Sequence, residues 1–489
     1  MPASPLSPPR SRAAADLLTV RQLADQAFSR ASGAPLRGGN RVRLLKDAVE
    51  NYPAWLTAIA GATSTIHLEM YFISDDEQGV QFADALLAKA QAGVSVVVIY
   101  DWLGGRGYSR RAYWNRLRAG GVEVLCYNRP RFDEPMGWVS RDHRKSLIVD
   151  GTIGFVTGLC IGRQWVGDRA QGLDPWRDTG VQIEGPAVAD LEAAFVDSYL
   201  AAGGDAARTV AWQTAAAGDS GPGTVALRVV ATEPNTAFLF RVDQLVAAMA
   251  RQTLWLTDAY YGGTSPYVQA LSAAARDGVD VRLLVPGSSD IPIVRALSRA
   301  GYRPLLEAGV RVFEWKGSML HAKTAVADGR WARVGSTNLN VASWIGNREL
   351  DVVIEDAVFA GHVEQMYLQD LNNSTEVVLD ASHHVKPSRS PAVKRSRPRG
   401  SGGRLMAGAV RVGHTMAAAM TSTRVLEPVE AHIALLGGAL LLCLAALAWF
   451  VPRVLTYPVI AIAVWFGLAL TYRAWTLYRK RRRSSSPVS

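Results

Sequence analysis

The chain has 489 residues, 49% of them hydrophobic, so it is long enough for more than one domain and can bury a sizeable core. Its net charge of +10 is unevenly distributed: residues 385–489 hold 16 Lys and Arg but two Glu, which leaves residues 1–384 with 37 basic and 41 acidic side chains. This mildly acidic part argues against a nucleic-acid partner, because binding to the phosphate backbone depends on Lys and Arg. The three cysteines and eight histidines have no zinc-ligand spacing, so we expect no metal and no cofactor.

The chain begins with an expected disordered or helical segment at residues 1–35. No apolar run follows the Pro/Ser-rich start, so a signal peptide is not expected. Residues 36–201 and 224–375 alternate period-2 apolar runs with helical runs of ten or more residues, which is typical of α/β layers. Residues 202–223, rich in Ala and Gly, are the expected linker between these two stretches.

Two apolar runs near the C-terminus predict membrane-spanning helices. Residues 433–451 and 454–472 each contain nineteen residues without a charged side chain, separated only by Pro452-Arg453. At ~1.5 Å per residue each run reaches about 28 Å, close to the roughly 30 Å hydrocarbon core of a bilayer. We therefore expect a tight transmembrane helical hairpin; the alternative is a buried hairpin of a soluble domain.

Basic segments flank these runs, at residues 385–404, expected to be a disordered linker, and in the tail 473–489. The positive-inside bias then places both ends of the hairpin, and the rest of the chain, in the cytoplasm. The basic clusters either attract anionic lipid headgroups or only fix the orientation of the spans in the membrane.

The two long stretches repeat each other, which indicates duplicated structural units. The offset between matching residues is 178 at His143 and His321 but 171 at Asp178 and Glu349. The first stretch therefore carries a loop of about seven extra residues, which we place at Gly167–Asp174. Other matching segments are Ile66–Phe72 with Leu254–Tyr261, Ala90–Asp101 with Ala274–Pro286, and Arg118–Asn128 with Leu306–Trp315.

The strongest feature of the repeat is a His-x-Lys motif in a strand-like apolar run. His143 and Lys145 form the first copy, and His321 and Lys323 form the second. Phosphodiester exchange through a covalent intermediate needs one imidazole to attack and another to protonate the leaving oxygen. It also needs fixed positive charge for the phosphoryl oxygens. We therefore expect the two copies to form one site on a pseudo-two-fold axis.

Several nearby residues fit more than one role. Asp150 and Asp328 follow the motifs, but each precedes Gly, and Asp-Gly is also a strong turn signal. We therefore treat both as structural residues of the motif. Ser336 fits either binding of an active-site water or capping of a helix. Cys160 is interpreted as a small buried residue rather than a nucleophile.

These residues make the chain resemble the phospholipase D superfamily and, within it, the bacterial cardiolipin synthases. The resemblance covers roughly Gly38–Asp370 and implies two phospholipase D-like α/β/α sandwich halves related by a pseudo-two-fold axis. It departs from the family at Cys160, which stands where the second half has Asn338. The matching motif residues are His143, Lys145, Asp150 and Gly158 in the first half, and His321, Lys323, Asp328, Gly335, Ser336 and Asn338 in the second.

The resemblance also implies roles. His143 would attack phosphorus, and His321 would act as general acid and then as base; the reverse assignment fits the same residues. Asp178 and Glu349 would each orient the imidazole of the opposite half, as the carboxylate of a triad does. The side chains expected to hold the phosphoryl oxygens are Lys145, Lys323, Asn338 and Ser336.

Motif and anchor together predict a membrane-bound phosphatidyltransferase of the bacterial inner membrane. A phosphohistidine would pass its phosphatidyl group to the headgroup hydroxyl of a second lipid, such as phosphatidylglycerol, and yield cardiolipin or a related lipid. The alternative is a phospholipase D, with water as acceptor and phosphatidic acid as product, because acceptor choice depends on how the pocket excludes water. A nuclease is disfavoured by the acidic main part, and a non-catalytic adaptor by the two intact motifs.

Overall fold

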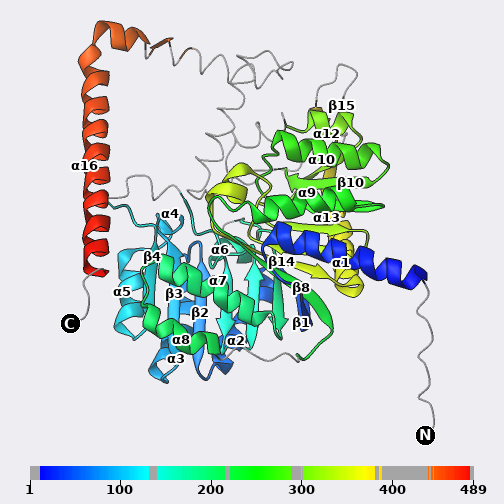
Figure 1. Cartoon of the computed structure of the whole chain (residues 1–489), viewed down its shortest axis with the longest axis horizontal. Helices are drawn as coiled ribbons and strands as arrows, with labels where there is room; N and C mark the ends of the chain where they lie inside the picture. Colours follow the sequence, from blue (N-terminus) through cyan, green and yellow to red (C-terminus); the bar gives the residue numbers. More distant parts are fainter. Residues whose placement is uncertain are drawn as a thin grey trace.

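The computed structural model describes residues 12–131, 140–168, 170, 172–214, 221–287, 299, 301–379, 385–387, 439, 442–443 and 445–484. Its main body is a mixed α/β structure built on one large sheet with helices packed on it (Figure 1). The first-half strands are β1 (Arg37–Lys46), β2 (Thr65–Met70), β3 (Ser95–Asp101), β4 (Glu123–Tyr127), β5 (Ser146–Val149), β6 (Ile153–Thr157) and β7 (Thr179–Glu184). The second-half strands are β8 (Val225–Thr232), β9 (Thr253–Thr257), β10 (Asp280–Pro286), β11 (Arg311–Trp315), β12 (Thr324–Ala327), β13 (Trp331–Gly335), β14 (Glu349–Glu355), β15 (Ser374–Leu379) and β16 (Val385–Pro387).

The strand order shows the duplication directly. The first half runs β1-β7-β6-β5-β2-β3-β4, and the second runs β8-β14-β13-β12-β9-β10-β11 in the same pattern, with β15 and β16 added at its edge. The antiparallel pair of β1 and β8 joins the halves at the centre of a 16-stranded sheet. The expected α/β class is therefore confirmed, but the halves share one continuous sheet instead of forming separate sandwiches.

Helices cover both faces of the sheet because successive strand residues point to opposite sides. In β3, Val96 and Val98 pack in one buried cluster, whereas Val97 and Ile99 pack in another with residues of α7. The helices of the main body are α1 (Arg12–Ser32), α2 (Asp47–Gly61), α3 (Glu77–Gln91), α4 (Trp102–Gly105), α5 (Arg111–Ala119), α6 (Arg163–Val166), α7 (Val188–Ala201), α8 (Ala206–Thr214), α9 (Phe238–Met249), α10 (Ser265–Arg276), α12 (Arg303–Glu307), the π-helix η3 (Ala342–Gly346) and α13 (Ala357–Asn372).

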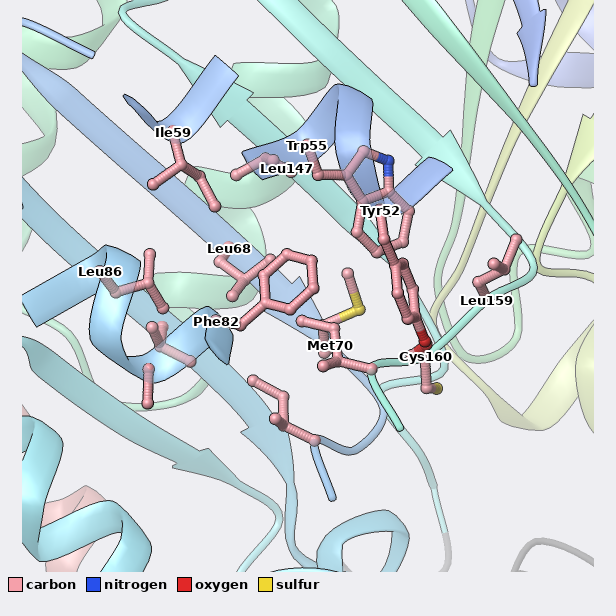
Figure 2. Close-up of a cluster of buried hydrophobic side chains, with 14 of the residues drawn as sticks. Tyr52, Trp55, Ile59, Leu68, Met70, Phe82, Leu86, Leu147, Leu159 and Cys160 are labelled. Atoms are coloured by element: carbon pink, nitrogen blue, oxygen red, sulfur yellow. The ribbon is translucent and has the colours of Figure 1, made fainter. Parts of the chain in front are cut away.

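The core of the first half packs aromatic rings between α2, α3 and the sheet. The rings of Tyr52 and Phe82 lie 5.4 Å apart edge to face, and Trp55 is fully buried beside them (Figure 2). The Tyr52 hydroxyl donates a hydrogen bond of 2.7 Å to the backbone carbonyl of Cys160. Burial raises the pKa of the Cys160 thiol, and the side chain is 1% exposed. The interpretation of Cys160 as a buried residue is thus confirmed.

The structure adds detail to two segments: it forms the helical alternative at the N-terminus and a helix within the expected linker. The N-terminal segment forms helix α1, which lies along α9 (Figure 1). The predicted linker at residues 202–223 contains helix α8, whose Trp212 is buried against Tyr199 with ring centroids 5.0 Å apart. An apolar contact of this kind ties the connecting segment to the first half.

The expected transmembrane hairpin is not shown. Among the described residues, one helix is long and apolar enough to cross a membrane, Thr456–Trp475 within α16 (Pro452–Ser484). Nine of the nineteen residues in the first predicted span, 433–438, 440–441 and 444, lie outside the described residues. Helix α16 continues beyond the second predicted span into the basic tail, because Arg and Lys are good helix formers. Figure 1 shows it as a separate rod beside the main body.

Asp150 and Asp328 occupy equivalent structural positions at the ends of β5 and β12. The Asp150 carboxylate accepts hydrogen bonds of 2.7–2.8 Å from the backbone N–H groups of Thr63, Ser64 and Thr65. The Asp328 carboxylate binds the backbone N–H groups at the start of β9 in the same way. Each Asp therefore fixes the register of a motif strand against its neighbour, and the two take no part in the candidate site.

We predict that Asp150→Asn destabilises the fold by roughly 2 kcal/mol at pH 7, because it removes charge from a set of hydrogen bonds. Burial alone would raise the pKa of Asp150, but the N–H groups of Thr65, Thr63 and Ser64 outweigh it and hold that pKa below 3.8. The stabilisation is thus present above pH 3.8 and is lost as the pH falls through the lowered pKa. Urea unfolding at pH 7 and pH 3 measures both effects.

The matched control is Asp84→Asn, which removes a surface carboxylate with 55% exposure from its ion pair with Arg116. It should change stability by less than about 0.5 kcal/mol. An Asp150→Asn protein as stable as the parent at pH 7 would contradict the structural role.

Candidate active site

Each His-x-Lys motif immediately precedes a central strand and pairs with the other half. The His143 N–H donates to the Arg348 carbonyl at 2.9 Å, and the His321 N–H donates to the Arg177 carbonyl at 2.7 Å. The pairing between the halves continues in two isolated β-bridges, Asp142 with Arg348 and Arg177 with Leu320. The motif segment of each half is therefore held against the Arg-acid segment of the other, and the two motifs meet at the junction of the halves.

The two imidazoles are each paired with a carboxylate from the opposite half, which is the arrangement the resemblance implied. His143 Nδ1 lies 2.8 Å from Glu349 Oε2, and His321 Nδ1 lies 2.7 Å from Asp178 Oδ2. Both carboxylates are fully buried. A carboxylate that accepts from Nδ1–H fixes the tautomer and leaves the Nε2 lone pair available for reaction.

Burial keeps both imidazoles neutral in the free protein. It lowers the pKa of His143 to about 4, with Glu349 opposing and Lys145 adding to the effect. It lowers the pKa of His321 to about 3, and the adjacent Lys323 lowers it further while Asp178 opposes. Each histidine also experiences the Lys of the opposite motif, which reflects how close the motifs are. Each imidazole can thus act as a nucleophile at neutral pH, and an anionic substrate would favour protonation of one of them.

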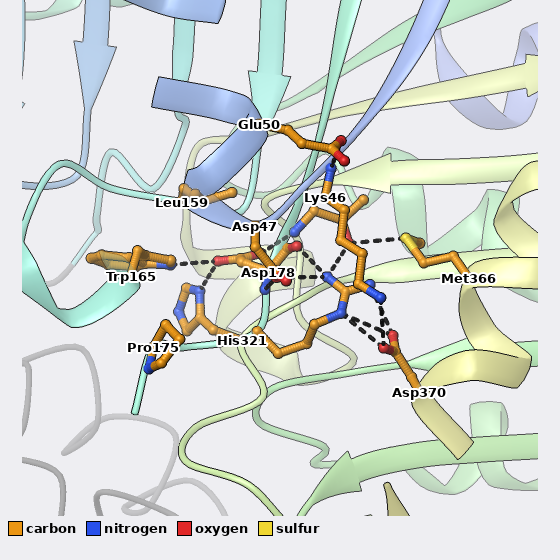
Figure 3. A network of polar contacts seen from close by, with 12 residues as sticks. Lys46, Asp47, Glu50, Leu159, Trp165, Pro175, Asp178, His321, Met366 and Asp370 are labelled. Atoms are coloured by element: carbon orange, nitrogen blue, oxygen red, sulfur yellow. Dashed lines mark hydrogen bonds and ion pairs between the residues drawn. The ribbon is translucent and has the colours of Figure 1, made fainter. Parts of the chain in front are cut away.

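Different donors support the two carboxylates. The Trp165 indole N–H donates to Asp178 Oδ2 at 2.9 Å (Figure 3), whereas the Ser336 hydroxyl donates to Glu349 Oε2 at 2.6 Å. Gly158 stands where the second half has Ser336, and a Cβ there would lie 2.1 Å from Asp178 Oδ1. Ser336 therefore contacts the orienting carboxylate, and its binding of a phosphate oxygen or a water stays a prediction.

The two lysines lie beside the imidazoles. Lys145 donates to the His143 carbonyl at 2.5 Å, and its ammonium group lies 5.2 Å from the centroid of the Tyr71 ring. Lys323 donates to the His321 carbonyl and lies 2.9 Å from His321 Nδ1. Burial lowers the pKa of Lys323 from 10.5 to about 8. Two cations in a buried site can bind the anionic oxygens of a phosphodiester.

Asn338 is the remaining predicted phosphate ligand. Its Nδ2 lies 3.5 Å from Ser343 Oγ in η3, and its buried Oδ1 has no hydrogen-bond partner among the described residues. A weakly held amide of this kind can turn its N–H group toward a bound oxygen. Gly335 packs against Asp351, where a Cβ would lie 2.3 Å from a carboxylate oxygen, so its role is structural.

Aromatic rings that motif reasoning missed form the walls of the site. Tyr71 lies 5.0 Å from His143 between ring centroids, Trp165 and Trp176 each lie 5.6 Å from His321, and Tyr260 lies 5.9 Å from it. These rings come from segments outside the His-x-Lys pattern. Their positions in the sequence could have indicated them. Tyr71 and Tyr260 lie in the matched strand segments, and Trp165 and Trp176 flank the predicted extra loop Gly167–Asp174. Aromatic walls around reacting groups limit the access of water.

Comparison with known proteins agrees with this geometry. The family model described as "Cardiolipin synthase, PLD-like domain" matches residues 55–170 and 246–371, once in each half. Cardiolipin synthase A of Pseudomonas aeruginosa (strain LESB58) is 34% identical over 395 residues, which is 76% of each chain. Cardiolipin synthase 1 of Bacillus anthracis is 30% identical over 362 residues, covering 71% of this chain and 70% of the relative.

The crystal structure of phosphatidylserine synthase from Haemophilus influenzae Rd KW20 has the same fold. It superposes with a TM-score of 0.57 at 16% identity, covering 72% of this chain and 92% of that chain. The chain belongs to the cardiolipin synthase family of phospholipase D-like proteins. The resemblance drawn from the duplicated motif is thus confirmed, and with it the expectation of a cardiolipin synthase-like phosphatidyltransferase.

We predict an alkaline limb in the pH profile that belongs to Lys323. Because burial lowers the pKa of Lys323 to about 8, its charge is lost as the pH rises through that value, and binding of the phosphodiester weakens. The kcat/KM for a short-chain phosphatidylglycerol should therefore fall above about pH 8. In Lys323→Arg the guanidinium stays charged, so any remaining activity should keep its plateau to higher pH. An unchanged alkaline limb in that variant would assign the titration to another group.

Proposed function

We propose that this chain makes cardiolipin from two molecules of phosphatidylglycerol. The observation that carries the proposal is the exchange of His–carboxylate pairs between the halves, which brings two neutral imidazoles and two lysines into one buried site. Homologues named cardiolipin synthase, similar over about three quarters of the chain, support a phospholipid substrate.

The reaction proceeds by two displacements at one phosphorus atom. In the first, an imidazole Nε2 attacks the phosphorus of a phosphatidylglycerol, the bond from phosphorus to the headgroup oxygen breaks, and the second imidazole, protonated, gives its proton to the departing glycerol. In the second, that imidazole takes the proton from a glycerol hydroxyl of another phosphatidylglycerol. The hydroxyl oxygen attacks phosphorus, the phosphorus–nitrogen bond breaks, and cardiolipin forms. We assign the attack to His143 and the proton transfers to His321.

The surrounding residues support both steps. Lys145, Lys323 and Asn338 hold the two non-bridging oxygens, whose charge stays fixed while the axial bonds exchange. Asp178 and Glu349 keep each Nδ1 protonated and stabilise whichever imidazole becomes cationic. The aromatic walls favour a lipid hydroxyl over water as the acceptor, and this favours the synthase over the alternative, a phospholipase D.

We place the enzyme at the bacterial cytoplasmic membrane with its catalytic body in the cytoplasm. Helix α16 carries exposed apolar side chains along its length, including Val459, Ile462 and Leu468, and these suit a hydrocarbon environment. Basic residues before and after the apolar runs favour a cytoplasmic location for both flanks, which requires a second span at residues 433–451.

We predict that the purified full-length protein converts phosphatidylglycerol vesicles into cardiolipin and free glycerol. His143→Ala and His321→Ala should each reduce turnover by at least about 10³-fold, since both imidazoles act in both displacements. Mass spectrometry of the lipid products and a glycerol assay measure the reaction. The matched control is His362→Ala, which changes a histidine of α13 outside the site.

Phosphatidic acid as the sole lipid product would identify a hydrolase and refute the synthase. Retained turnover in either histidine variant would refute the two-imidazole scheme. A base-stable, acid-labile adduct can also be sought after a rapid alkaline quench, with a phosphatidyl p-nitrophenyl ester as donor because its leaving group needs no proton. His321→Ala should then accumulate phosphatidyl-enzyme if His143 attacks, whereas accumulation in His143→Ala would reverse the assignment.

We predict that the C-terminal tail lies on the cytoplasmic side, as a two-span anchor demands. In a Cys443→Ala background, Ser486→Cys should resist a membrane-impermeant maleimide added to intact spheroplasts and should react after permeabilisation. Labelling without permeabilisation would place the tail outside the cytoplasm and contradict a two-span anchor with cytoplasmic ends.

A further inference from the structure

Arg141 is a buried cation that the candidate mechanism does not use. The residue is 4% exposed, and its Nε and Nη1 atoms have no hydrogen-bond partner among the described residues. A buried guanidinium with unpaired N–H groups is costly, because it has lost water without gaining an acceptor. Burial raises the pKa of the Asp101 carboxyl to about 6 and Arg141 opposes this rise, so the Asp101 carboxylate partly balances the charge of Arg141. The two unpaired N–H groups still suit an anion that binds there during function.

Arg141 shares a face of the backbone with the first motif. The chain around His143 is extended: the Arg348 N–H donates to the Arg141 carbonyl at 2.7 Å, and the His143 N–H donates to the Arg348 carbonyl at 2.9 Å. Alternate residues of an extended segment point to the same side, so Arg141, His143 and Lys145 face one way. The intervening Arg144 faces the other way and binds backbone and hydroxyl oxygens of α7.

Tyr71 marks the place where these three side chains meet. Its ring lies 5.0 Å from the His143 ring, and the Lys145 ammonium lies 5.2 Å from its centroid. Burial raises the pKa of the Tyr71 phenol and Asp101 raises it further, whereas Arg141 lowers it, so the guanidinium charge is near the hydroxyl. The Tyr71 hydroxyl is itself buried and has no partner among the described residues. Two unpaired donors thus lie beside the first motif.

The second half does not carry these donors at the matching positions, although Tyr260, one residue after the counterpart of Tyr71, lies 5.9 Å from His321 between ring centroids. The motif offset of 178 residues makes Met319 the counterpart of Arg141. The matching register of β2 on β5 and of β9 on β12 makes Ala259 the counterpart of Tyr71. Both counterparts are buried apolar residues. The displacement at phosphorus uses one His-x-Lys motif from each half, so a donor pair at matching positions of one half alone suits a ligand group that lies on one side of the site.

We propose that Arg141 and Tyr71 form a second phosphate subsite, which holds the phosphodiester of the accepting lipid. The inference rests on the proposed function: joining two phospholipids brings two phosphates to the site, and the His-x-Lys groups hold the one that is attacked. The other must be held where its glycerol hydroxyl reaches the phosphorus. A guanidinium binds phosphate through two parallel N–H groups, and a phenol adds one further donor. Water and simple alcohols carry no phosphate, so the subsite selects a lipid acceptor.

The test compares two acceptors for the same phosphatidyl group. Full-length protein receives phosphatidylglycerol vesicles with ethanol added, and cardiolipin, phosphatidylethanol and phosphatidic acid are measured together. In Arg141→Met, which installs the residue of the other half, the ratio of cardiolipin to phosphatidylethanol should fall roughly 10–100-fold, the loss expected for a charged hydrogen-bonded contact. The control is Arg110→Met, which removes an arginine with 84% exposure and should leave the ratio unchanged.

Two further variants keep the test decisive if Arg141→Met folds poorly. Arg141→Lys keeps the positive charge but lacks the two parallel N–H donors, and Tyr71→Phe removes one hydroxyl. Each should lower the ratio of cardiolipin to phosphatidylethanol by a smaller factor. A parallel loss of cardiolipin and phosphatidylethanol, or an unchanged ratio in the variants that fold, would overturn the subsite. Wild-type protein that forms none of the three products would instead refute the proposed function, whatever the variants do.

Discussion

The exchange of buried His–carboxylate pairs between the two halves is the interaction on which the rest of the site depends. His143 is oriented by Glu349, 206 residues further along the chain, and His321 by Asp178, 143 residues before it. Neither half holds a complete His–carboxylate pair, so the site is complete only because β1 and β8 join the halves into one sheet. Breaking one pair would leave a fully buried carboxylate without its partner, which is costly in a low-dielectric interior.

Within this symmetric frame the side chains are not symmetric. Asp178 receives an indole N–H from Trp165, whereas Glu349 receives a hydroxyl from Ser336. Cys160 is buried in the apolar cluster at the position where the second half presents Asn338. Two imidazoles with similarly lowered pKa values must still take different parts in a displacement at phosphorus, and unequal surroundings provide the physical basis for that difference.

In the proposed function, the candidate membrane helix and the site would serve the same chemical need. A lipid substrate resides in the bilayer, while its phosphodiester must reach cations that are buried in a folded domain. Under the proposed function, the candidate membrane helix Thr456–Trp475 would keep the chain at the bilayer, and the aromatic rings around His143 and His321 would limit the access of water, the competing nucleophile. Transfer between lipids, as proposed, would thus depend both on a position at the membrane and on the exclusion of water from the site.

The sequence by itself determined the α/β class, the duplication and both His-x-Lys motifs, because strand periodicity and motif spacing are local properties of the chain. The pairing of Asp178 and Glu349 with opposite halves followed from family resemblance, since no local pattern encodes it. The tertiary structure alone decided that both halves share one sheet, that Ser336 binds Glu349, and that Trp165 binds Asp178. These features depend on strand register and on contacts between residues far apart in sequence, and a one-residue change of register would turn the same side chains away.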